Sequence, residues 1–590
     1  MNKYSPQFFI VFSIFIFLFT SCSPQVTPPP HVIQEITPTS IPNSSVEIIT
    51  FTPAPEGVQI GDSVPLALRE QITSLDLPAS ASVHLDISSS VQSDSVKTKI
   101  QWIYALVAPF PTLKDGVTFD ELHLAWTEGT APAPFSGMPL LMDESTLAAF
   151  TALWDRPVAE SIQVVPSDQL LDVAWAETCT EPCRSDPSWA IIPFESLEPR
   201  WKVLTVDDQS PIRKGFDISS YPLVVDFALQ TSEDLQSSDS SISQLPTTNY
   251  DSSKLTTVIL TGVTALVRAT AYTMELKGAT YPGEKIRDLM READIAHVSN
   301  EIPFFTGCTF PKPDAGALVF CSDPKYMDLL TDIGTDVVEL TGNHFADRGA
   351  AGMLETIAIY NANELPYFGG GVDLQDSLKP ALFEVNGNKI AFIGCNKPDV
   401  NRFPTATDFQ PGAAPCDFSY LTQKINQLKA DGYVVISTFQ WNESYDAIPS
   451  PSQHTDFRLM ADAGASIVSG SQAHYAQAME FRNGSFIHYG LGNLFFDQMG
   501  DQAWMPRGIR REFFDRYVIY DGRFISTELI TALLEDYSRP RLMTEQERTG
   551  FLQEYFYYSG WVPLIPTPTP TITPTLTPMS IPPSASTPGP

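Results

Sequence analysis

The chain has 590 residues, of which 43% are hydrophobic and 18% charged, as in a globular protein. One hydrophobic core rarely extends beyond about 250–300 residues, so the length predicts two domains plus tails. The 36 Lys and Arg residues against 69 Asp and Glu residues give a formal net charge of -33. This charge repels the phosphate backbone of nucleic acids, and we therefore expect no nucleic-acid partner.

The amino terminus has the pattern of an export signal. Phe8 to Phe19 is an apolar run that follows Lys3 and is too short to span a bilayer as a helix. Its end, Leu18-Phe19-Thr20-Ser21-Cys22, resembles a bacterial lipobox, although Phe19 stands where Leu is usual. The pattern predicts a lipid on Cys22 that anchors the chain to a bacterial membrane; the alternative is an ordinary secretion signal with an incidental cysteine. Either way, we expect an extracytoplasmic protein.

Composition divides the rest of the chain into folded blocks and low-complexity segments. The segments rich in Pro, Thr and Ser cannot bury enough apolar surface to fold. We predict a signal peptide at 1–21, a linker at 22–56, a smaller α/β domain at 57–230, a Ser-rich linker at 231–254, the main domain at 255–545, a short extension at 546–562 and a disordered Thr-Pro tail at 563–590.

The smaller block alternates strand-like and helix-like runs, which indicates an α/β domain. Two segments, 189–195 and 197–204, faintly resemble a lobe of periplasmic solute-binding proteins, and the alternative is a plain structural domain. The expected elements are strands at Ile100–Phe110, Ser161–Val165 and Trp189–Phe194 and a helix at Glu144–Trp154.

The main block combines β-branched strands, amphipathic helices and three Asn-Gly or Asp-Gly turns. Those turns, at Asn386-Gly387, Asn483-Gly484 and Asp521-Gly522, predict β-hairpins. Helices between the other strands predict mixed sheets covered by helices, with the site in loops after the strand ends. The expected strands are Leu255–Leu260, Asp294–Val298, Asp336–Leu340, Val434–Thr438 and Ser466–Val468, and the expected helices are Gly283–Arg291, Pro324–Ile333, Ala350–Asn361 and Ser452–Ala463.

Six further cysteines fall into neighbouring pairs. Local disulfides are the simplest interpretation in an exported protein. A metal site is the alternative, but no pair has the two-by-two thiolate spacing of structural zinc. The predicted bridges join Cys179 to Cys183, Cys308 to Cys321, and Cys395 to Cys416.

Polar residues follow five of the expected strands. A single histidine beside a strand is more often structural than functional, but five polar segments in series indicate a shared site. The segments are Ser299-Asn300-Glu301, Gly342-Asn343-His344 with Asp347, Gln440-Trp441-Asn442-Glu443, Gly470-Ser471-Gln472-Ala473-His474, and residues 490–498.

From Leu260 to Gln498, the order of these segments resembles the CapA family of poly-gamma-glutamate capsule biosynthesis proteins, whose domain is related to calcineurin-like metallophosphoesterases. Glu301 matches the glutamate of the family's Asn-Leu-Glu segment, and Gly342-Asn343-His344 matches its Asn-Asn-His segment. Residues 470–477 resemble Gly-x-His-Pro-His-x-x-Gln, and residues 492–498 resemble Gly-Asn-Phe-x-Phe-Asp-Gln. The resemblance implies an α/β fold, a metallophosphoesterase-like α/β/β/α sandwich preceded by the smaller α/β domain.

That fold normally holds two divalent metals about 3.5–4 Å apart, which clamp a phosphate and activate a water. The resemblance implies roles for ten residues. The metal ligands would be Glu301, Asn343 and His474. The catalytic residues would be His344, as acid or charge stabiliser, and Asp347, which orients it. The substrate-binding residues would be Arg268, Gln440, Gln472, Gln477 and Asn493.

Several family positions are changed. Val263 stands at the first metal-binding aspartate, and Gln440 and Gln472 stand at two family histidines, while Ser299 replaces an asparagine. Valine cannot bind a cation, and a glutamine amide is a weaker ligand than imidazole. We therefore expect one divalent metal of unknown identity, or none.

Two functions of different class follow. The one that the lost ligands favour is a non-catalytic surface lipoprotein that binds or organises an anionic polymer, such as poly-gamma-glutamate or another capsule or wall component. The alternative is a metal-dependent, phosphoesterase-like hydrolase of a surface substrate; a weaker idea makes the first block a solute sensor. Arg507, Arg510, Arg511 and Arg516 are candidate polymer contacts, or else a solvated basic face.

Overall fold

The computed structural model describes residues 57–75, 82–88, 96–176, 188–231, 242–313, 318–397, 405–500 and 507–561. The predicted signal, Cys22, the pair Cys179 and Cys183, and the Thr-Pro tail lie outside the described residues. Within these ranges, no helix combines the length and the hydropathy that crossing a bilayer requires.

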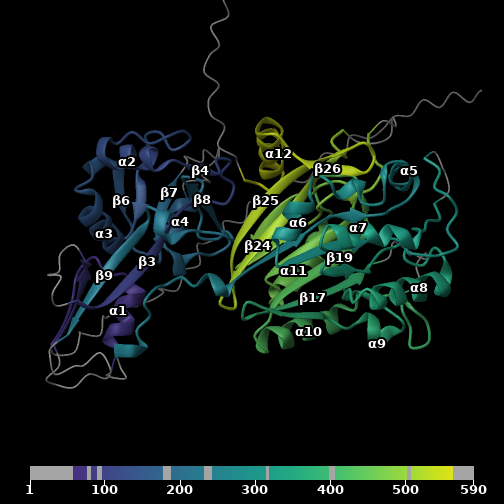
Figure 1. Ribbon diagram of the computed structural model, residues 1–590, viewed down its shortest axis with the longest axis horizontal. Helices are drawn as coiled ribbons and strands as arrows, with labels where there is room; N and C mark the ends of the chain where they lie inside the picture. Colours follow the sequence, from purple (N-terminus) through teal and green to yellow (C-terminus); the bar gives the residue numbers. More distant parts are fainter. Residues whose placement is uncertain are drawn as a thin grey trace, which may run out of the picture. The chain divides into compact units, whose positions relative to one another are not determined.

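The first block is built on one sheet, drawn in purple and blue in Figure 1. Its strand order is β1-β2-β9-β3-β7-β5-β6, with β8 beside β3 and β4 beside β8. The strands are β1 (Val58–Ile60), β2 (Val83–Ile87), β3 (Val96–Pro109), β4 (Gly116–Val117), β5 (Leu140–Met142), β6 (Ile162–Val164), β7 (Trp189–Pro193), β8 (Trp201–Val206) and β9 (Val224–Thr231), and the helices are α1 (Leu66–Thr73), α2 (Phe119–Glu128), α3 (Glu144–Trp154) and α4 (Leu170–Ala176).

All four elements expected in this block are present. The helix α3 spans the predicted residues, with Asp143 as its N-cap accepting a hydrogen bond from the Thr146 amide. The residues at 242–254, expected as part of a linker, pack onto the first block, where Leu245 and Tyr250 are buried. The same hydrophobic cluster includes Val518 and Tyr520 from the main block. The domain boundaries themselves stay a prediction.

The main block contains two large sheets. One has the order β14-β13-β12-β10-β24-β25-β26, and the other has the order β16-β17-β19-β20-β22-β21. The strands are β10 (Leu255–Leu260), β11 (Val263–Thr264), β12 (Ile295–Asn300), β13 (Val337–Glu339), β14 (Tyr367–Phe368), β15 (Gly370–Gly371), β16 (Ala381–Val385), β17 (Asn388–Asn396), β18 (Gly412–Ala413), β19 (Val434–Ser444), β20 (Ile467–Ala473), β21 (Met479–Arg482), β22 (Ser485–His488), β23 (Asn493–Phe495), β24 (Arg511–Tyr520), β25 (Arg523–Glu535) and β26 (Arg539–Leu542).

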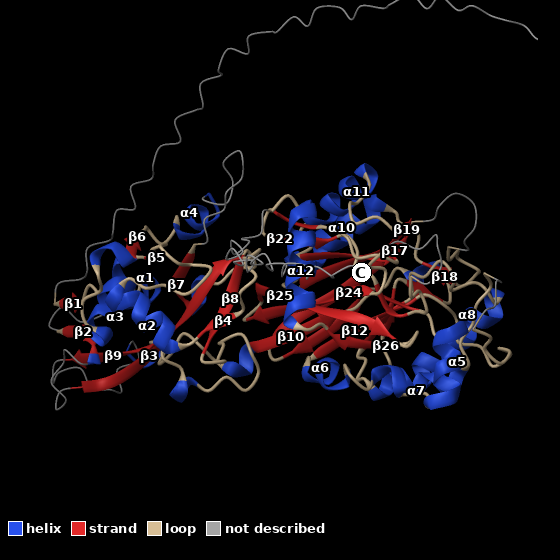
Figure 2. Ribbon diagram, turned by 90° about the horizontal axis from the view of Figure 1, so that it is seen from above, coloured by secondary structure: helices blue, strands red, loops and turns tan. Residues whose placement is uncertain are grey.

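Helices cover the outer faces of the two sheets. Figure 2 shows α10 and α11 beside one sheet and α5, α6 and α7 beside the other. The helices are α5 (Arg268–Lys277), α6 (Arg287–Glu292), α7 (Met327–Asp332), α8 (Gly349–Ala362), α9 (Leu374–Ser377), α10 (Phe418–Ala430), α11 (Pro451–Asp462) and α12 (Glu545–Tyr558). The mixed α/β class and the α/β/β/α layering agree with the sequence-based expectation.

Successive side chains of a strand point to opposite faces of its sheet and belong to different hydrophobic clusters. On β10, Val258 and Leu260 belong to the cluster between the sheets, together with Ile436 of the opposite sheet. The intervening Ile259 belongs instead to the cluster beneath α5 to α8. A strand whose successive side chains point to opposite faces can be apolar throughout only if both faces are covered.

The three predicted hairpins are confirmed. Antiparallel ladders join β16 to β17, β21 to β22, and β24 to β25. The turn residues Asn386 and Gly387 have φ values of 52° and 75°, and the other two turns show the same left-handed pair. Such turns match the right-handed twist of the flanking strands, which is why Asn-Gly and Asp-Gly predict them.

The central strands β19 and β20 are longer than predicted. Gln440 lies inside β19 and pairs with Ser471 inside β20, where loops were expected. The polar segments are held in the ladder by their neighbours, and the register shifts between Gln440 and Ser444. Pairing with adjacent strands thus overrides the polar composition that suggested loops.

Two of the predicted disulfides are confirmed. One joins Cys308 to Cys321 and the other joins Cys395 to Cys416. The first closes the loop between β12 and α7, and the second ties the end of β17 to the start of α10.

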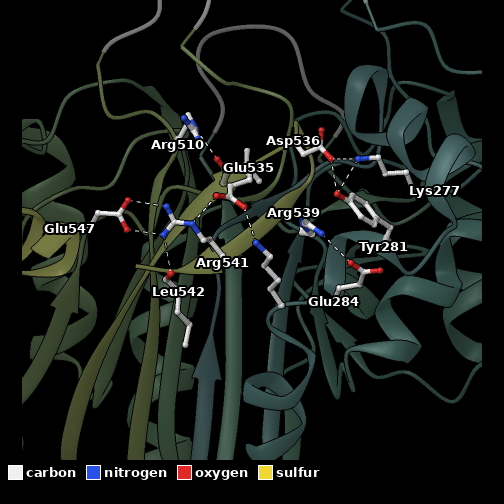
Figure 3. Close-up of polar contacts among 12 residues, drawn as sticks. Lys277, Tyr281, Glu284, Arg510, Glu535, Asp536, Arg539, Arg541, Leu542 and Glu547 are labelled. Atoms are coloured by element: carbon white, nitrogen blue, oxygen red, sulfur yellow. Dashed lines mark hydrogen bonds and ion pairs between the residues drawn. The ribbon is translucent and has the colours of Figure 1, made fainter. Parts of the chain in front are cut away.

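Ion pairs fix the edge strand β26. Arg541 lies between Glu535 and Glu547, and Arg539 contacts Glu284, as Figure 3 shows. Beside them, Asp536 accepts from the Tyr281 hydroxyl at 2.6 Å and pairs with Lys277. Charged side chains on an edge strand discourage pairing with another chain.

Candidate functional site

The predicted site residues lie mostly at the carboxyl ends of parallel strands. β10, β12 and β13 run parallel in one sheet, and β17, β19, β20 and β22 run parallel in the other. Because the carboxyl ends of parallel strands meet at one edge of a sheet, the segments that follow them come together. Glu301, Asn343, Gln440, Gln472 and His474 are all buried there.

A close backbone contact joins the segments after β12 and β13. A Cβ atom on Gly342 would lie 2.3 Å from the carbonyl oxygen of Glu301 and 2.6 Å from its Cα atom. Only a glycine permits this approach. Gly342 therefore places Asn343 and His344 directly beside Glu301.

His344 is held by Asp347. Its Nδ1 lies 2.8 Å from Asp347 Oδ2, which also accepts a 2.6 Å hydrogen bond from the Phe320 amide. The Phe320 ring packs on the imidazole, with 4.6 Å between ring centroids. The pair thus leaves Nε2 as the nitrogen that a ligand would meet.

The electrostatic surroundings favour the protonated form of His344. Burial opposes protonation, but the hydrogen bond to Asp347 and the charges of Glu301, Asp347 and Glu443 outweigh it and raise the pKa of His344 above its ordinary value. Protonated His344 is a cation with one N–H group engaged by Asp347.

A network of neutral amides and hydroxyls surrounds Asn343. Gln440 Nε2 donates a 3.2 Å hydrogen bond to Asn343 Oδ1. The Ser471 hydroxyl lies 3.1 Å from Gln440 Oε1 and 3.2 Å from Glu339 Oε1. Glu339, buried like its neighbours, also lies 3.4 Å from His297 Nε2.

A second chain of hydrogen bonds begins at His474. Its Nδ1 lies 2.8 Å from Asn493 Oδ1, and Asn493 Nδ2 donates to Gln498 Oε1 at 3.0 Å. Gln498 Nε2 then donates to the Tyr445 hydroxyl, which donates to Glu443 Oε1 at 2.6 Å. His474 also stacks on Phe496, with ring centroids 5.0 Å apart.

Arg268 is engaged by an internal carboxylate. Its Nε and Nη2 contact both oxygens of Asp497, and its guanidinium lies over the rings of Phe320 and Phe496. Arg268 and Gln472 have φ values of 44° and 69°, which is left-handed backbone that non-glycine residues rarely adopt. Such strain persists where surrounding contacts enforce it, and it is frequent at functional sites.

Four of the candidate ligand-binding side chains are engaged by other groups of the fold. They are Gln477 and three of the candidate polymer-binding arginines. Gln477 is fully buried and bonds to Gln453 and to the Asp446 carbonyl. The arginines are engaged inside the fold: Arg511 with Glu554, Arg516 with Glu528 and Glu292, and Arg510 with the Leu534 carbonyl, while Arg507 is exposed. Figure 3 includes Arg510. Arg511 and Arg516 are thus structural ion-pair partners.

Sequence reasoning assigned no role to four residues that the site contains. They are Glu339, Glu443, Tyr445 and Asp497: Glu339 contacts Ser471 of a predicted polar segment, and the other three contact or act electrostatically on His474, His344 or Arg268. Glu443 and Asp497 lay within recognised segments, so their carboxylates were a usable signal. Glu339 lay inside an expected strand, and the sequence did not indicate its role because its partners Ser471 and His297 are distant in sequence.

The side chains at the site do not fit a two-metal cage. Val263, at the position of the family's aspartate, is buried and has no ligand atom, and Gln440 offers a neutral amide, a weaker ligand than imidazole, with its N–H group directed at Asn343 Oδ1. Across the described ranges, no three His, Cys, Asp or Glu side chains cluster closely enough to hold a metal. Glu301 Oε2 is buried and accepts no hydrogen bond from the described residues.

Two stacked mixed sheets between helical layers, with a polar site at the strand ends, define the class as a layered α/β sandwich. Residues 257–498 match the family model of the bacterial capsule synthesis protein PGA_cap. The part of the chain that carries the site is therefore similar to the CapA family over residues 257–498.

Two relatives and one solved structure show the extent of the similarity. The PGA biosynthesis protein CapA of Bacillus subtilis is 29% identical over 225 residues, 38% of this chain and 59% of that protein. The capsule biosynthesis protein CapA of Bacillus anthracis is 33% identical over 171 residues, 28% of this chain and 41% of that protein. The chain thus spans about half the length of these relatives. The NAD nucleotidase of Haemophilus influenzae matches with 11% identity and a TM-score of 0.29 over 51% of this chain and 55% of that one, which is too low to carry an argument.

We predict that Gly342→Ala destabilises the fold, because its Cβ would meet the Glu301 backbone. The free energy of unfolding should fall by about 1–3 kcal/mol, the usual cost of overpacking. Gly550→Ala is the matched control: it lies inside α12 with no atom near its Cβ, and it should stabilise by about 0.5–1 kcal/mol. Calorimetric unfolding of both variants measures the difference, and a Gly342→Ala protein as stable as wild type would contradict the contact.

We predict that Asp347→Asn lowers the pKa of His344, because it removes the charge that favours the imidazolium. In the wild type the pKa is raised above the value of about 6.5 in an unfolded chain. Protonation of His344 therefore stabilises the fold fully below about pH 6.5, and this stabilisation is lost as pH rises through the folded-state pKa.

An NMR titration of labelled histidine Cε1–H signals measures this pKa. Asp431→Asn, an exposed carboxylate at the end of α10, is the control and should leave the titration of His344 unchanged. An unchanged midpoint in Asp347→Asn would show that the 2.8 Å contact does not govern His344.

Proposed function

We propose that the chain is a lipid-anchored surface protein that takes part in capsule biosynthesis by binding an anionic polymer, such as poly-gamma-glutamate, at a degenerate metal site. The names of its relatives support a role in capsule and PGA biosynthesis. The observation that supports the degenerate site is Gln440, whose amide stands where the family has an imidazole and whose N–H group points at Asn343 Oδ1.

The chemistry left at the site suits binding rather than hydrolysis. Without two cations there is no bridging water of lowered pKa to attack a substrate. The His344 and Asp347 pair instead offers a partly exposed imidazolium, with 19% of the His344 side chain accessible, next to fixed amide groups. An imidazolium N–H makes a charge-assisted hydrogen bond to a carboxylate or phosphate oxygen.

A metal-dependent hydrolase is the second candidate function. It is favoured by Glu301 Oε2, a buried carboxylate oxygen with no hydrogen-bond donor among the described residues. A single cation held there with His474 would satisfy it, and His344 would then serve as the general acid. The two functions differ in whether the chain retains metal and whether turnover depends on His344.

The deciding experiment uses the full chain in detergent. We expect less than one equivalent of divalent metal by elemental analysis, no hydrolysis of a phosphodiester or of poly-gamma-glutamate, and polymer binding that weakens about tenfold in His344→Ala, the effect of one lost charge-assisted hydrogen bond. His123→Ala, a histidine in α2 of the first block, is the control and should bind as wild type does. Stoichiometric metal with turnover that His344→Ala abolishes would instead establish the hydrolase.

The lipid anchor at Cys22 has its own test in the producing bacterium. We expect Cys22→Ser to move the protein from the membrane fraction to the soluble fraction, because the lipid on Cys22 is the proposed anchor. Ser23→Ala, which changes the neighbouring residue, should stay with the membranes. Immunoblots of both fractions measure this, and a Cys22→Ser protein that remains on the membrane would rule out lipidation as the anchor.

A further inference from the structure

A cavity of about 470 Å³ lies beside the candidate site, under the loop that the Cys308–Cys321 disulfide closes. We call it the Arg348 pocket. It shares Arg268 and Phe320 with the candidate site, and its volume is in the range of small-molecule sites. The side chains that define it are Arg268, Phe310, Lys312, Phe320, Lys325 and Arg348.

The carboxylates of the Arg348 pocket are already satisfied. Its acidic lining residues are Glu275 and Asp323, and both contact Lys325, at 2.5 and 3.8 Å. Glu275 also accepts a 2.6 Å hydrogen bond from the Tyr326 hydroxyl. Arg268 is bound to Asp497. Glu275, Asp323 and Asp497 are therefore all paired with cations other than Lys312 and Arg348.

Arg348 and Lys312 are those remaining cations. Neither side chain makes a hydrogen bond or an ion pair with the described residues, and Arg348 Nε is shielded from solvent without an acceptor. In a chain of net charge -33, two cations that line one pocket and have no carboxylate partner among the described residues run against the overall balance. A buried donor without an acceptor costs free energy, which an incoming acceptor would recover.

Glycine makes room for the Arg348 stem. A Cβ atom on Gly352, one turn along α8, would lie 2.4 Å from Arg348 Cβ. Arg348 also directly follows Asp347, which is fixed to His344 and to the Phe320 amide. The pocket and the candidate site are thus built on the same short segment.

One wall of the pocket is apolar and open to solvent. Phe310 and Val319 are 63% and 53% exposed, and Phe320 lies beneath the Arg268 guanidinium. Exposed apolar surface next to unpaired cations suits a ligand whose negative charge ends a hydrocarbon stem. A polyol phosphate, whose charges alternate with hydroxyl groups, would leave this wall uncovered.

We propose that the Arg348 pocket binds a carboxylate at the end of an aliphatic stem, with Arg348 and Lys312 making the ion pairs and the Phe310 wall covering the methylene groups. A γ-glutamate polymer bound beside His344 would place one of its carboxylates there and lay main-chain methylene groups on the Phe310 wall, and this last step rests on the proposed function. The pocket's preference for an aliphatic carboxylate does not rest on the proposed function.

Calorimetric titration of the full chain in detergent tests the pocket with three probes. They are glutarate, a short γ-glutamate oligomer and a glycerol-phosphate oligomer of matched charge. We expect Arg348→Gln to weaken the binding of glutarate and of the γ-glutamate oligomer about tenfold, Lys312→Gln to weaken it less because that side chain is exposed, and Arg348→Lys to retain part of it.

Lys285→Gln is the matched control. It removes one positive charge from a surface lysine paired with Glu535, and binding of all three probes should stay within about twofold of wild type. The thermal midpoint of each variant establishes that the fold is intact.

The outcomes separate this proposal from the proposed function. If the γ-glutamate oligomer binds equally well to wild type, Arg348→Gln and Lys312→Gln, the pocket proposal is wrong and polymer binding stands. If the oligomer does not bind wild type but glutarate binds in an Arg348-dependent manner, the proposed function fails and the pocket stands. Tighter, Arg348-dependent binding of the glycerol-phosphate oligomer would overturn the carboxylate preference.

Discussion

The apolar side chains packed between the two sheets of the main block are the constraint on which the site depends. Val258 and Leu260 from one sheet meet Phe392 and Ile436 from the other, and this contact sets which face of each strand is inside. A shift of one residue along any of these strands would turn its inner side chains outward. The same register brings the carboxyl ends of the parallel strands to one edge, where the polar segments meet.

Hydrogen-bond satisfaction gives that edge its chemical character. Asn343, Gln440 and Ser471 are buried and linked by hydrogen bonds, so neutral amides and a hydroxyl beside the Glu339 carboxylate form the centre of the site. Within this network the Gln440 amide donates to Asn343 Oδ1. A few residues away, Arg348 carries positive charge at the lining of a pocket, and the raised pKa of His344 favours the imidazolium there.

Local features of the fold were predictable from sequence. The turn at Asn386-Gly387, the helix capped by Asp143 and the disulfide between Cys308 and Cys321 depend on residues close together in the chain. The extent of β19 and β20 was not predictable, because their polar ends are strands only through pairing with neighbouring strands. The packing of Tyr250 onto the first block escaped notice for the same reason, since its partners lie far away in the chain.

The sequence by itself determined which segments form the candidate site, because the motif around Gly342-Asn343-His344 and its order among the other segments are local patterns. Only the tertiary structure decided which charged side chains have an ion-pair partner among the described residues. Arg516 is neutralised by Glu528 and Glu292, and Arg268 by Asp497, while no carboxylate among the described residues pairs with Arg348. Coulomb interactions depend on distance in space, and spacing along the chain does not reveal that distance.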